Sequence, residues 1–269
     1  MKYDPIKRSL GTVFHKSPWT RIFFYKLLNL LLLRNWHIKK EIKKIRKSLP
    51  EHAKILDAGA GFGQYTYYLS KQSSKWKIHA VDIKQEQIDD CNEFFKKLGK
   101  ENQVRFEFED LTKFSKIEEY DLALSVDVME HIEEDEVVFQ NICKALKPGG
   151  ILLISTPSDQ GGSDVQHEHE ESFIDEHVRD GYNKQEIETK LTNAGFSSIR
   201  SQYSYGIPGK ISWKLSMKYP ILLLNKSKLF FILLPFDYLL FFPVSYVLNL
   251  LDVHNFHKTG TGLIIAAKK

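Results

Sequence analysis

Alternating glycines occupy the segment Asp57-Ala58-Gly59-Ala60-Gly61-Phe62-Gly63, between a short apolar run and a segment of helical pattern that begins near Gln64. Glycine allows the backbone to turn sharply and to approach a ligand without a Cβ in the way. The dinucleotide fingerprint Gly-x-Gly-x-x-Gly requires glycine at position 64, where this chain has glutamine. The segment therefore predicts a strand-to-helix turn at a nucleotide-type cofactor site, with a spacing that differs from the dinucleotide pattern.

Apolar strand-like runs alternate with helical patterns between residues 51 and 205, which is typical of a parallel sheet with crossover helices. The predicted strands are 53–58, 77–82, 103–108, 120–126, 150–155 and 198–204, with a last strand at 262–267. The predicted helices are 64–74, 85–98, 134–146 and 183–194, the last of them capped by Gly195.

Charge is distributed very unevenly along the chain. The net charge of +4 divides into +11 for residues 1–50, −13 for residues 51–207 and +6 for residues 208–269. The two basic segments are also the most apolar, a combination that favours anionic lipid headgroups rather than nucleic acid. Cys91 and Cys143 are too few for a disulfide framework, so we expect a reducing, cytoplasmic compartment. Lys26 interrupts the apolar stretch 22–33, which argues against a signal peptide.

Further motifs follow the glycines in order, and together they carry a family resemblance. They are Val81-Asp82-Ile83, Glu109-Asp110-Leu111, the segment from Ser125 to His131, and Leu146-Lys147-Pro148-Gly149-Gly150. With these motifs the chain resembles a class I S-adenosylmethionine (SAM) dependent methyltransferase, of the kind that modifies lipids, quinones and other small molecules. The resemblance implies an α/β fold: a Rossmann-like seven-stranded sheet of six parallel strands and an antiparallel last strand, with helices on both faces.

The resemblance also implies a division of the chain and a set of cofactor residues. We expect an N-terminal helical extension (1–50), a SAM-binding core (51–205), a hydrophobic insertion (206–260) and the last core strand (261–269). The glycine loop would lie against the methionine part of SAM, Asp82 would accept from both ribose hydroxyls, and Asp110 would read the adenine. A solvated strand end for Asp82 and a helix cap for Asp110 are the alternative interpretations. The full set of expected cofactor residues is Asp57, Gly59, Gly61, Gly63, Asp82, Ile83, Asp110, Leu111 and Ser125.

Methyl transfer from a sulfonium is an in-line displacement, so alignment matters most and a catalytic base is optional. Hydroxyl acceptors benefit from a base whose pKa is near 7, to which histidine is suited. His131, in a Glu-His pair after the fourth strand, and His177, near Arg179 and Tyr182, are the candidates. We expect His131, His177 and Tyr182 to be catalytic, with a capping or loop-bracing role as the alternative for either histidine.

His167 and His169 stand among carboxylates in a spacing that metal sites also use. The stretch follows Gly161-Gly162 in a long polar connection, where a solvated acidic loop is the usual outcome. We therefore predict no metal site.

More than fifty residues separate the sixth and seventh predicted strands, which relatives join by a short turn. This insertion leaves the carboxyl end of the sixth strand, the edge at which open α/β sheets bind ligands. Residues 229–251 carry a single charge, Asp237, while Pro235 and Pro243 are expected to break a long helix. Because the last strand must return to the sheet, we expect a broken, interfacial or lid-like segment joined by an apolar helix around Trp19 to Trp36.

The combined prediction is a methyltransferase, peripherally attached to the membrane, for a lipophilic acceptor such as a lipid, a quinone or phenol, or a pigment precursor. Two alternatives stay open. One is a methyltransferase for a soluble small molecule, with the greasy segment as lid or dimer contact. The other is a SAM- or lipid-binding protein without turnover.

Overall fold

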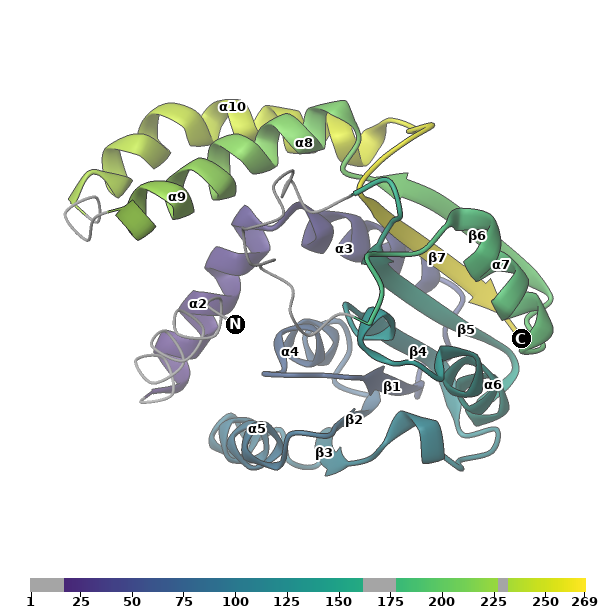
Figure 1. Ribbon diagram of the computed structural model, residues 1–269. Coiled ribbons are helices and arrows are strands. Elements are labelled where there is room, and N and C mark those ends of the chain that lie inside the picture. Colours follow the sequence, from purple (N-terminus) through teal and green to yellow (C-terminus); the bar gives the residue numbers. More distant parts are fainter. Residues whose placement is uncertain (1–16, 162–177, 227–231) are drawn as a thin grey trace.

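A seven-stranded mixed sheet forms the centre of the protein in the computed structural model, which describes residues 17–161, 178–226 and 232–269 (Figure 1). The strand order is β3-β2-β1-β4-β5-β7-β6. All neighbouring pairs are parallel except those of β7, which runs antiparallel to both β5 and β6. The strands are β1 (Lys54–Ala58), β2 (Lys77–Asp82), β3 (Val104–Phe108), β4 (Tyr120–Val126), β5 (Leu146–Pro157), β6 (Ser198–Ser204) and β7 (Gly262–Lys268).

This arrangement confirms the predicted fold, with six strands in one direction and the last strand reversed. The predicted strand bounds agree to within a residue or two except in β5, which begins at Leu146 instead of residue 150. The pairing of β4 with β5 shifts register between Tyr120 and Leu122, and Gly149 adopts a φ of 78° there. The Lys147-Pro148-Gly149-Gly150 turn is therefore an irregular start of the strand, which glycine permits.

Helices cover both faces of the sheet because alternate strand residues point to opposite sides. Ala123 faces a core shared with α6 (Asp135–Ala145) and α7 (Lys184–Asn193). Leu122 and Leu124 face a second core, shared with the helices on the other face. These are α3 (Leu33–Ile45), α4 (Gln64–Ser70) and α5 (Gln85–Lys97). Two short 3₁₀ turns, η1 (Leu111–Lys113) and η2 (Met129–His131), follow β3 and β4.

The N-terminal extension consists of two helices, and the boundary between them, at Leu32, lies inside the apolar helix that the sequence predicted around Trp19 to Trp36. α2 (Pro18–Leu31) begins at Ser17, whose side chain accepts from the Trp19 N–H, and it ends at Leu32. Leu32 is extended, with φ −86° and ψ 110°, and α3 starts after it. In α3 the side chains of Ile38, Ile42 and Ile45 share one side of the helix and are buried against the sheet.

The insertion forms a helical hairpin between β6 and β7. Its first leg is α8 (Ile207–Trp213), the π-helical turn η3 (Lys214–Lys218) and α9 (Tyr219–Lys226); its second leg is α10 (Leu234–His254). The two legs lie side by side and pass over α3 (Figure 1). The expectation that Pro243 would break this region is wrong, because Pro243 lies inside the 21-residue helix α10, whereas Pro235 stands at its start. Within the described residues, α10 is the one helix long and apolar enough to span a membrane by length and composition.

Candidate cofactor and acceptor site

The glycine loop lies where β1 ends beside β2, and its backbone is fixed by the neighbouring strand. The N–H groups of Gly59 and Ala60 both donate to the Val81 carbonyl, at 2.9 and 3.0 Å. Gly59 has a φ of 77°, and a Cβ added to it would lie 2.3 Å from Val128 Cγ2. Gly61 also has a positive φ, yet the nearest atom to an added Cβ is 3.8 Å away. The backbone at Gly61 therefore has open space beside it, as the close approach of a cofactor requires.

Asp82, at the end of β2, connects the glycine loop to the start of α5. Its Oδ2 accepts from the Gly61 N–H at 2.8 Å, and its Oδ1 accepts from the Lys84 N–H at 3.0 Å. A carboxylate offers about four lone-pair positions, so each oxygen retains acceptor capacity for a ribose hydroxyl. The next side chain, Ile83, is 62% exposed, which leaves an apolar surface beside this carboxylate. These groups fit the ribose and adenine ends of SAM.

Asp110 caps η1, the alternative that the sequence left open. Its Oδ1 accepts from the N–H and the hydroxyl of Thr112, at 3.0 and 2.7 Å. The hydroxyl of Thr112 is the main cause that holds the pKa of Asp110 below its usual value. Oδ2 lies 3.3 Å from Lys113 Nζ and is the oxygen left for a ligand amine. Leu111 is buried in the core beneath this turn rather than open to a ligand.

Asp57, which precedes the glycines, is buried beneath them. It accepts a hydrogen bond from the Thr66 hydroxyl of α4 at 2.5 Å. Burial raises the pKa of Asp57 to about 7, against the lowering effect of that hydrogen bond. The side chain therefore stabilises the junction between β1 and α4 from within, and its cofactor role stays a prediction.

Helix α2 contacts the outside of the same loop, which the sequence did not predict. The Phe62 carbonyl accepts from Arg21 Nη2 at 2.7 Å and from the Tyr25 hydroxyl. Arg21 also forms an ion pair with Asp90 at 2.5 Å, and its guanidinium lies over the Phe94 ring. The signal in the sequence is a pair of polar residues, Arg21 and Tyr25, one helical turn apart in a largely apolar segment.

The start of α3 meets the carboxyl end of β4, a second contact that the sequence did not reveal. Arg34 forms an ion pair with Asp127, which adopts a φ of 53° directly after β4. The Arg34 N–H donates to the Tyr205 hydroxyl at 3.1 Å, at the point where β6 ends. Tyr65 of α4 donates to Asn35. The N-terminal extension therefore contributes a cation to the edge at which the acceptor would approach SAM.

Two buried polar side chains lie close to the carboxyl end of β4. They are Ser125, within the strand, and Glu130, in the turn η2 that follows it. Ser125 is almost fully buried, and its hydroxyl has no hydrogen-bond partner among the described residues. Glu130 is fully buried and accepts from the Thr156 hydroxyl at 3.0 Å through Oε2. Burial raises the pKa of Glu130 above its ordinary value. In the sequence, Glu130 stands out only as part of a Glu-His pair.

The three predicted catalytic residues have different outcomes. His131 is exposed at the end of η2 beside Glu130, so it lies at the correct sheet edge. His177 lies outside the described residues, as do His167 and His169. Among the residues that the structure describes, no group of three His, Cys, Asp or Glu side chains is placed to hold a metal ion.

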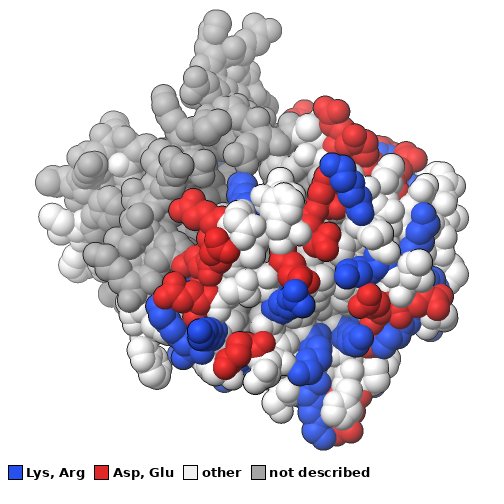
Figure 2. All heavy atoms as spheres, turned by 90° about the horizontal axis from the view of Figure 1, so that it is seen from below, with Lys and Arg blue, Asp and Glu red and all other residues white. Residues whose placement is uncertain are grey.

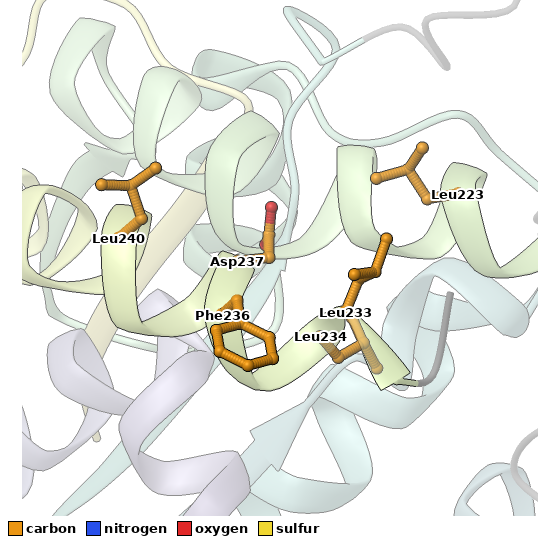
Figure 3. Close-up of a pocket in the computed structure, with 6 residues that line it drawn as sticks. All are labelled: Leu223, Leu233, Leu234, Phe236, Asp237 and Leu240. Atoms are coloured by element: carbon orange, nitrogen blue, oxygen red, sulfur yellow. The ribbon is translucent and has the colours of Figure 1, made fainter. Parts of the chain in front are cut away.

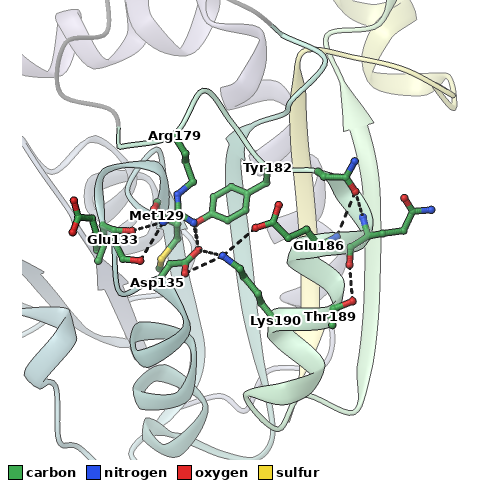
Figure 4. A network of polar contacts seen from close by, with 11 residues as sticks. Met129, Glu133, Asp135, Arg179, Tyr182, Glu186, Thr189 and Lys190 are labelled. Carbon is green, nitrogen blue, oxygen red and sulfur yellow. Dashed lines mark hydrogen bonds and ion pairs between the residues drawn. The ribbon is translucent and has the colours of Figure 1, made fainter.

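Tyr182 is the centre of a buried ionic network (Figure 4). Its hydroxyl donates to Asp135 Oδ2 at 2.6 Å and accepts from Arg179 Nη1 at 3.0 Å. Lys190 of α7 lies 3.0 Å from the same Asp135 oxygen. Burial raises the pKa of Tyr182, and the Asp135 carboxylate raises it further. These contacts give Tyr182 a structural role that joins α6 to α7, and its catalytic role stays a prediction.

Two pockets lie away from the glycine loop. One, of about 420 Å³, is lined by Lys54, Lys77 and Val104 at the amino ends of β1, β2 and β3, opposite the cofactor edge. The other, of about 280 Å³, lies in the hairpin and is lined by Leu223, Leu233, Leu234, Phe236, Asp237 and Leu240 (Figure 3). On the face shown in Figure 2, acidic and basic side chains are interspersed. That face lacks the gathered Lys and Arg of a nucleic-acid-binding surface.

Curated relatives match the central part of the chain. Malonyl-[acyl-carrier protein] O-methyltransferase 2 of Ilyobacter polytropus is 29% identical over 119 residues, covering 44% of this chain and 43% of that protein. Ubiquinone biosynthesis O-methyltransferase of Rickettsia canadensis is 33% identical over 103 residues, covering 38% and 42%. Phosphoethanolamine N-methyltransferase 1 of Triticum aestivum is 28% identical over 159 residues, covering 54% and 28%. The chain thus spans less than half the length of these relatives.

Solved structures share the fold. Phosphoethanolamine N-methyltransferase 2 of Haemonchus contortus, in complex with phosphomonomethylethanolamine and S-adenosylhomocysteine, aligns with a TM-score of 0.61 at 20% identity, covering 87% of this chain and 53% of that one. A model of the methyltransferase domain family matches residues 49–203, more than half of the chain. The predicted cofactor, SAM, is confirmed by this family membership. The chain therefore belongs to the methyltransferase domain family and is a class I SAM-dependent methyltransferase.

Proposed function

We propose that this enzyme methylates a lipophilic acceptor and that it works while peripherally attached to the cytoplasmic face of a membrane. The observation that carries the proposal is the hairpin α8–α10, an extensive exposed apolar surface on an element that starts beside the cofactor edge. Exposed apolar surface of this extent is typical of interaction with membranes, ligands or other proteins.

A short series of contacts links the hairpin to the site. Tyr205 follows β6 directly, and its hydroxyl accepts from the backbone of Arg34. Arg34 in turn pairs with Asp127 at the end of β4. The hairpin begins two residues after Tyr205, at Ile207, which is itself exposed. An acceptor that follows the apolar surface would thus arrive at the edge where the glycine loop and Asp82 lie.

When bound, SAM supplies an electrophilic methyl group on a sulfonium. The groups around it need to orient the acceptor and exclude water, because alignment accounts for most of the rate enhancement in such displacements. Asp82 and the glycine loop would hold the ribose side, while His131 and the Arg34–Asp127 pair would stand where the acceptor approaches. His131 would take a proton from a hydroxyl acceptor, and an amine acceptor needs no base.

The names of the relatives cover a thioester-carried acid, a quinone precursor and an aminoalcohol phosphate. The common element is the methyl donor rather than the acceptor. The hydrophobic insertion is the feature that supports one class over the others, and it favours a membrane-borne quinone, phenol or lipid over a soluble metabolite.

The test is a product search with the full chain, SAM, and either a membrane lipid extract or an aqueous metabolite extract. We expect S-adenosylhomocysteine and a new methylated product with the lipid extract, identified by mass spectrometry. Asp82→Ala is the control, because loss of two charge-assisted hydrogen bonds should weaken SAM binding at least about tenfold. Turnover confined to the aqueous extract would refute the lipophilic acceptor, and SAM binding without turnover in either extract would refute an enzymatic role.

A further inference from the structure

The interface between the two legs of the hairpin is built from small and polar side chains. On the first leg they are Gly209, Ser212 and Ser216, and on α10 they are Ser245, Asn249 and Asp252, all of them buried. The spacing of three and four residues places each set on one face of its helix. We call these six residues the polar seam.

Direct hydrogen bonds join the two sides of the polar seam. The Ser212 hydroxyl donates to the Ser245 carbonyl at 3.1 Å, and the Gly209 N–H donates to Asp252 Oδ2 at 3.0 Å. A Cβ added to Gly209 would lie 2.6 Å from that carboxylate oxygen. The helices therefore approach closely at residues without bulk.

Large apolar side chains point away from the polar seam. Phe236, Leu239, Leu240, Phe241, Val244 and Val247 of α10 are each between 38% and 77% exposed. At 3.6 residues per turn they are spread over roughly 200° of the helix circumference. A soluble helical hairpin buries its apolar side chains between the helices and exposes its polar ones, so this hairpin has the opposite arrangement.

Helices in a lipid environment have this arrangement, because lipid solvates apolar side chains and small or hydroxyl residues let the helices approach. Pro243 inside α10 agrees with it, since proline is more frequent in membrane helices than in soluble ones. We propose that the hairpin α8–α10 is embedded in the outer part of a single leaflet of an anionic phospholipid bilayer. This inference rests on the proposed function and deepens it by defining which surface meets the lipid and how deeply.

The charges on the first leg determine how the hairpin is oriented relative to the bilayer. Lys210, Lys214 and Lys218 follow one another at steps of four residues, outside the polar seam, whereas α10 contains no lysine or arginine. The ammonium groups of these lysines are complementary in charge to the phosphates of anionic headgroups. The first leg therefore lies at the headgroups and α10 lies deeper, against the acyl chains.

The sheet decides against a single crossing of the bilayer, and Lys210, Lys214 and Lys218 in the first leg argue against a double one. The two ends of the hairpin are joined to β6 and β7, where Ser204 pairs directly with Gly262. Both ends thus stay on the side of the catalytic domain. A second copy of the chain would cover this surface poorly. The exposed apolar side chains of α10 span roughly 200° of its circumference, and one flat protein contact would cover only part of that arc. Fluid lipid can surround all of it.

The base of the hairpin is fixed to the catalytic domain by Asp252. This carboxylate lies 2.8 Å from His37 Nε2 of α3 and 3.3 Å from His257 Nε2, and it accepts from the Tyr205 N–H at 3.1 Å. Trp36 packs against Tyr246 with ring centroids 5.0 Å apart. The depth of α10 in lipid therefore determines the height of the active site above it. The apolar pocket beside Leu240 and Leu223 (Figure 3) stands open to the same lipid.

Vesicle flotation with the full chain tests the surface. Leu239→Glu should reduce partitioning onto phosphatidylcholine–phosphatidylglycerol vesicles roughly tenfold or more, because it places a charge among acyl chains. Ile117→Glu is the matched control, since Ile117 is 72% exposed on the sheet domain, and it should partition like the wild type. Pure phosphatidylcholine vesicles should bind more weakly than mixed ones. Equal binding by Leu239→Glu and the wild type would overturn the proposal.

The depth of each leg in the bilayer is measured with nitroxide labels attached to the variants Leu240→Cys and Lys214→Cys. The native Cys91 and Cys143 are buried, so the label reacts at the introduced cysteine. With vesicles, the label at 240 should be accessible to oxygen and shielded from an aqueous relaxation agent, and the label at 214 should show the reverse preference. Aqueous access at both positions would overturn the proposal. So would a wild-type dimer in sedimentation, without vesicles, that Leu239→Glu converts to monomers.

The lipophilic acceptor and the lipid-embedded hairpin can be refuted independently of each other. Vesicle binding and the depth pattern are measured without an acceptor, so their success without any lipid product would refute only the proposed acceptor class. SAM affinity of Leu239→Glu, measured by calorimetry, should equal that of the wild type, because Leu239 is remote from the glycine loop in the fold.

Discussion

Asp57 is the residue whose protonation the fold alters most clearly near the cofactor. Its carboxyl group is buried beneath the glycine loop, and its pKa rises from 3.8 to about 7. At a pH between these two pKa values, Asp57 is protonated in the folded protein and ionised in the unfolded chain. Ionising the group in place is unfavourable, so its contribution to stability is present at low pH and is lost as the pH rises toward 7.

Asp57→Asn should therefore flatten part of the pH dependence of unfolding. We expect the wild type to lose up to about 1.4 kcal/mol per pH unit from this group between about pH 5 and about pH 7, and the variant to lack that decline. Urea unfolding at a series of pH values measures it. Asp110→Asn is the control, because the pKa of Asp110 is lowered and it stays ionised in this range. Parallel pH profiles for Asp57→Asn and the wild type would contradict the assignment.

Contacts between residues that end neighbouring strands could be predicted from the sequence, whereas contacts between separately packed segments could not. Gly59, Gly61 and Asp82 meet as the sequence suggested, because each stands at the end of a parallel strand and such ends share one edge. Arg34 and Asp127 form their ion pair across distant parts of the chain. No local pattern encodes that contact, since it depends on how α3 packs on the sheet.

At the scale of elements, helix α2 has two different faces, one that contacts the glycine loop and one that is exposed and apolar. Arg21 and Tyr25 face inward and hold the Phe62 carbonyl of the glycine loop. Trp19 and Phe23 face outward and are 81% and 62% exposed. The sequence predicted an apolar helix here but not its polar inner face, because a helical period shows which residues share a side and not what that side contacts.

Tyr25→Phe should weaken SAM binding while leaving the fold intact. The variant loses one hydrogen bond to the loop and keeps that of Arg21, so we expect a roughly twofold to tenfold higher dissociation constant. Isothermal calorimetry with SAM provides the measurement. Trp19→Ala, on the exposed face of the same helix, should bind SAM as the wild type does. If Tyr25→Phe also binds SAM with wild-type affinity, α2 does not support the loop.

The insertion shows where sequence reasoning about elements was incomplete. Pro243 was expected to interrupt the helix, yet α10 continues through it. The expectation used the cost of proline inside a helix, which is reduced where neighbouring helices or hydroxyl side chains satisfy the freed backbone groups. The helical content, the position beside the sheet edge and the apolar character were all predictable from composition and topology. The polar seam was not, because it requires knowing which helix faces pair.

At the scale of the whole molecule, Asp252 is the point at which the insertion, the N-terminal extension and the end of β6 converge. Burial alone would raise the pKa of Asp252, but the hydrogen bond and charge of His37, the charge of His257 and the Gly209 N–H together lower it. The carboxylate is thus stabilised in its ionised form by groups from separate segments.

Asp252→Asn should lower the free energy of unfolding by about 1–3 kcal/mol, because a buried donor loses its charged acceptor. Denaturant unfolding measures this loss, and limited proteolysis within the hairpin should become faster at the same time. Asp237→Asn, at the other end of α10, serves as the control and should not destabilise the protein. A fully stable Asp252→Asn variant would show that the hairpin is held by its other contacts.

The place of β7 between β5 and β6 has a consequence for how the protein is made. β6 has β7 as its sheet neighbour, so it gains its ladder only when residues 262–268 have been synthesised. Until β7 is available, the hairpin has its apolar faces uncovered and the sheet is still open. Partly folded chains with exposed apolar surface aggregate readily. Capture of the nascent hairpin by a membrane, as proposed above, would therefore protect the chain from aggregation before the final strand pairs.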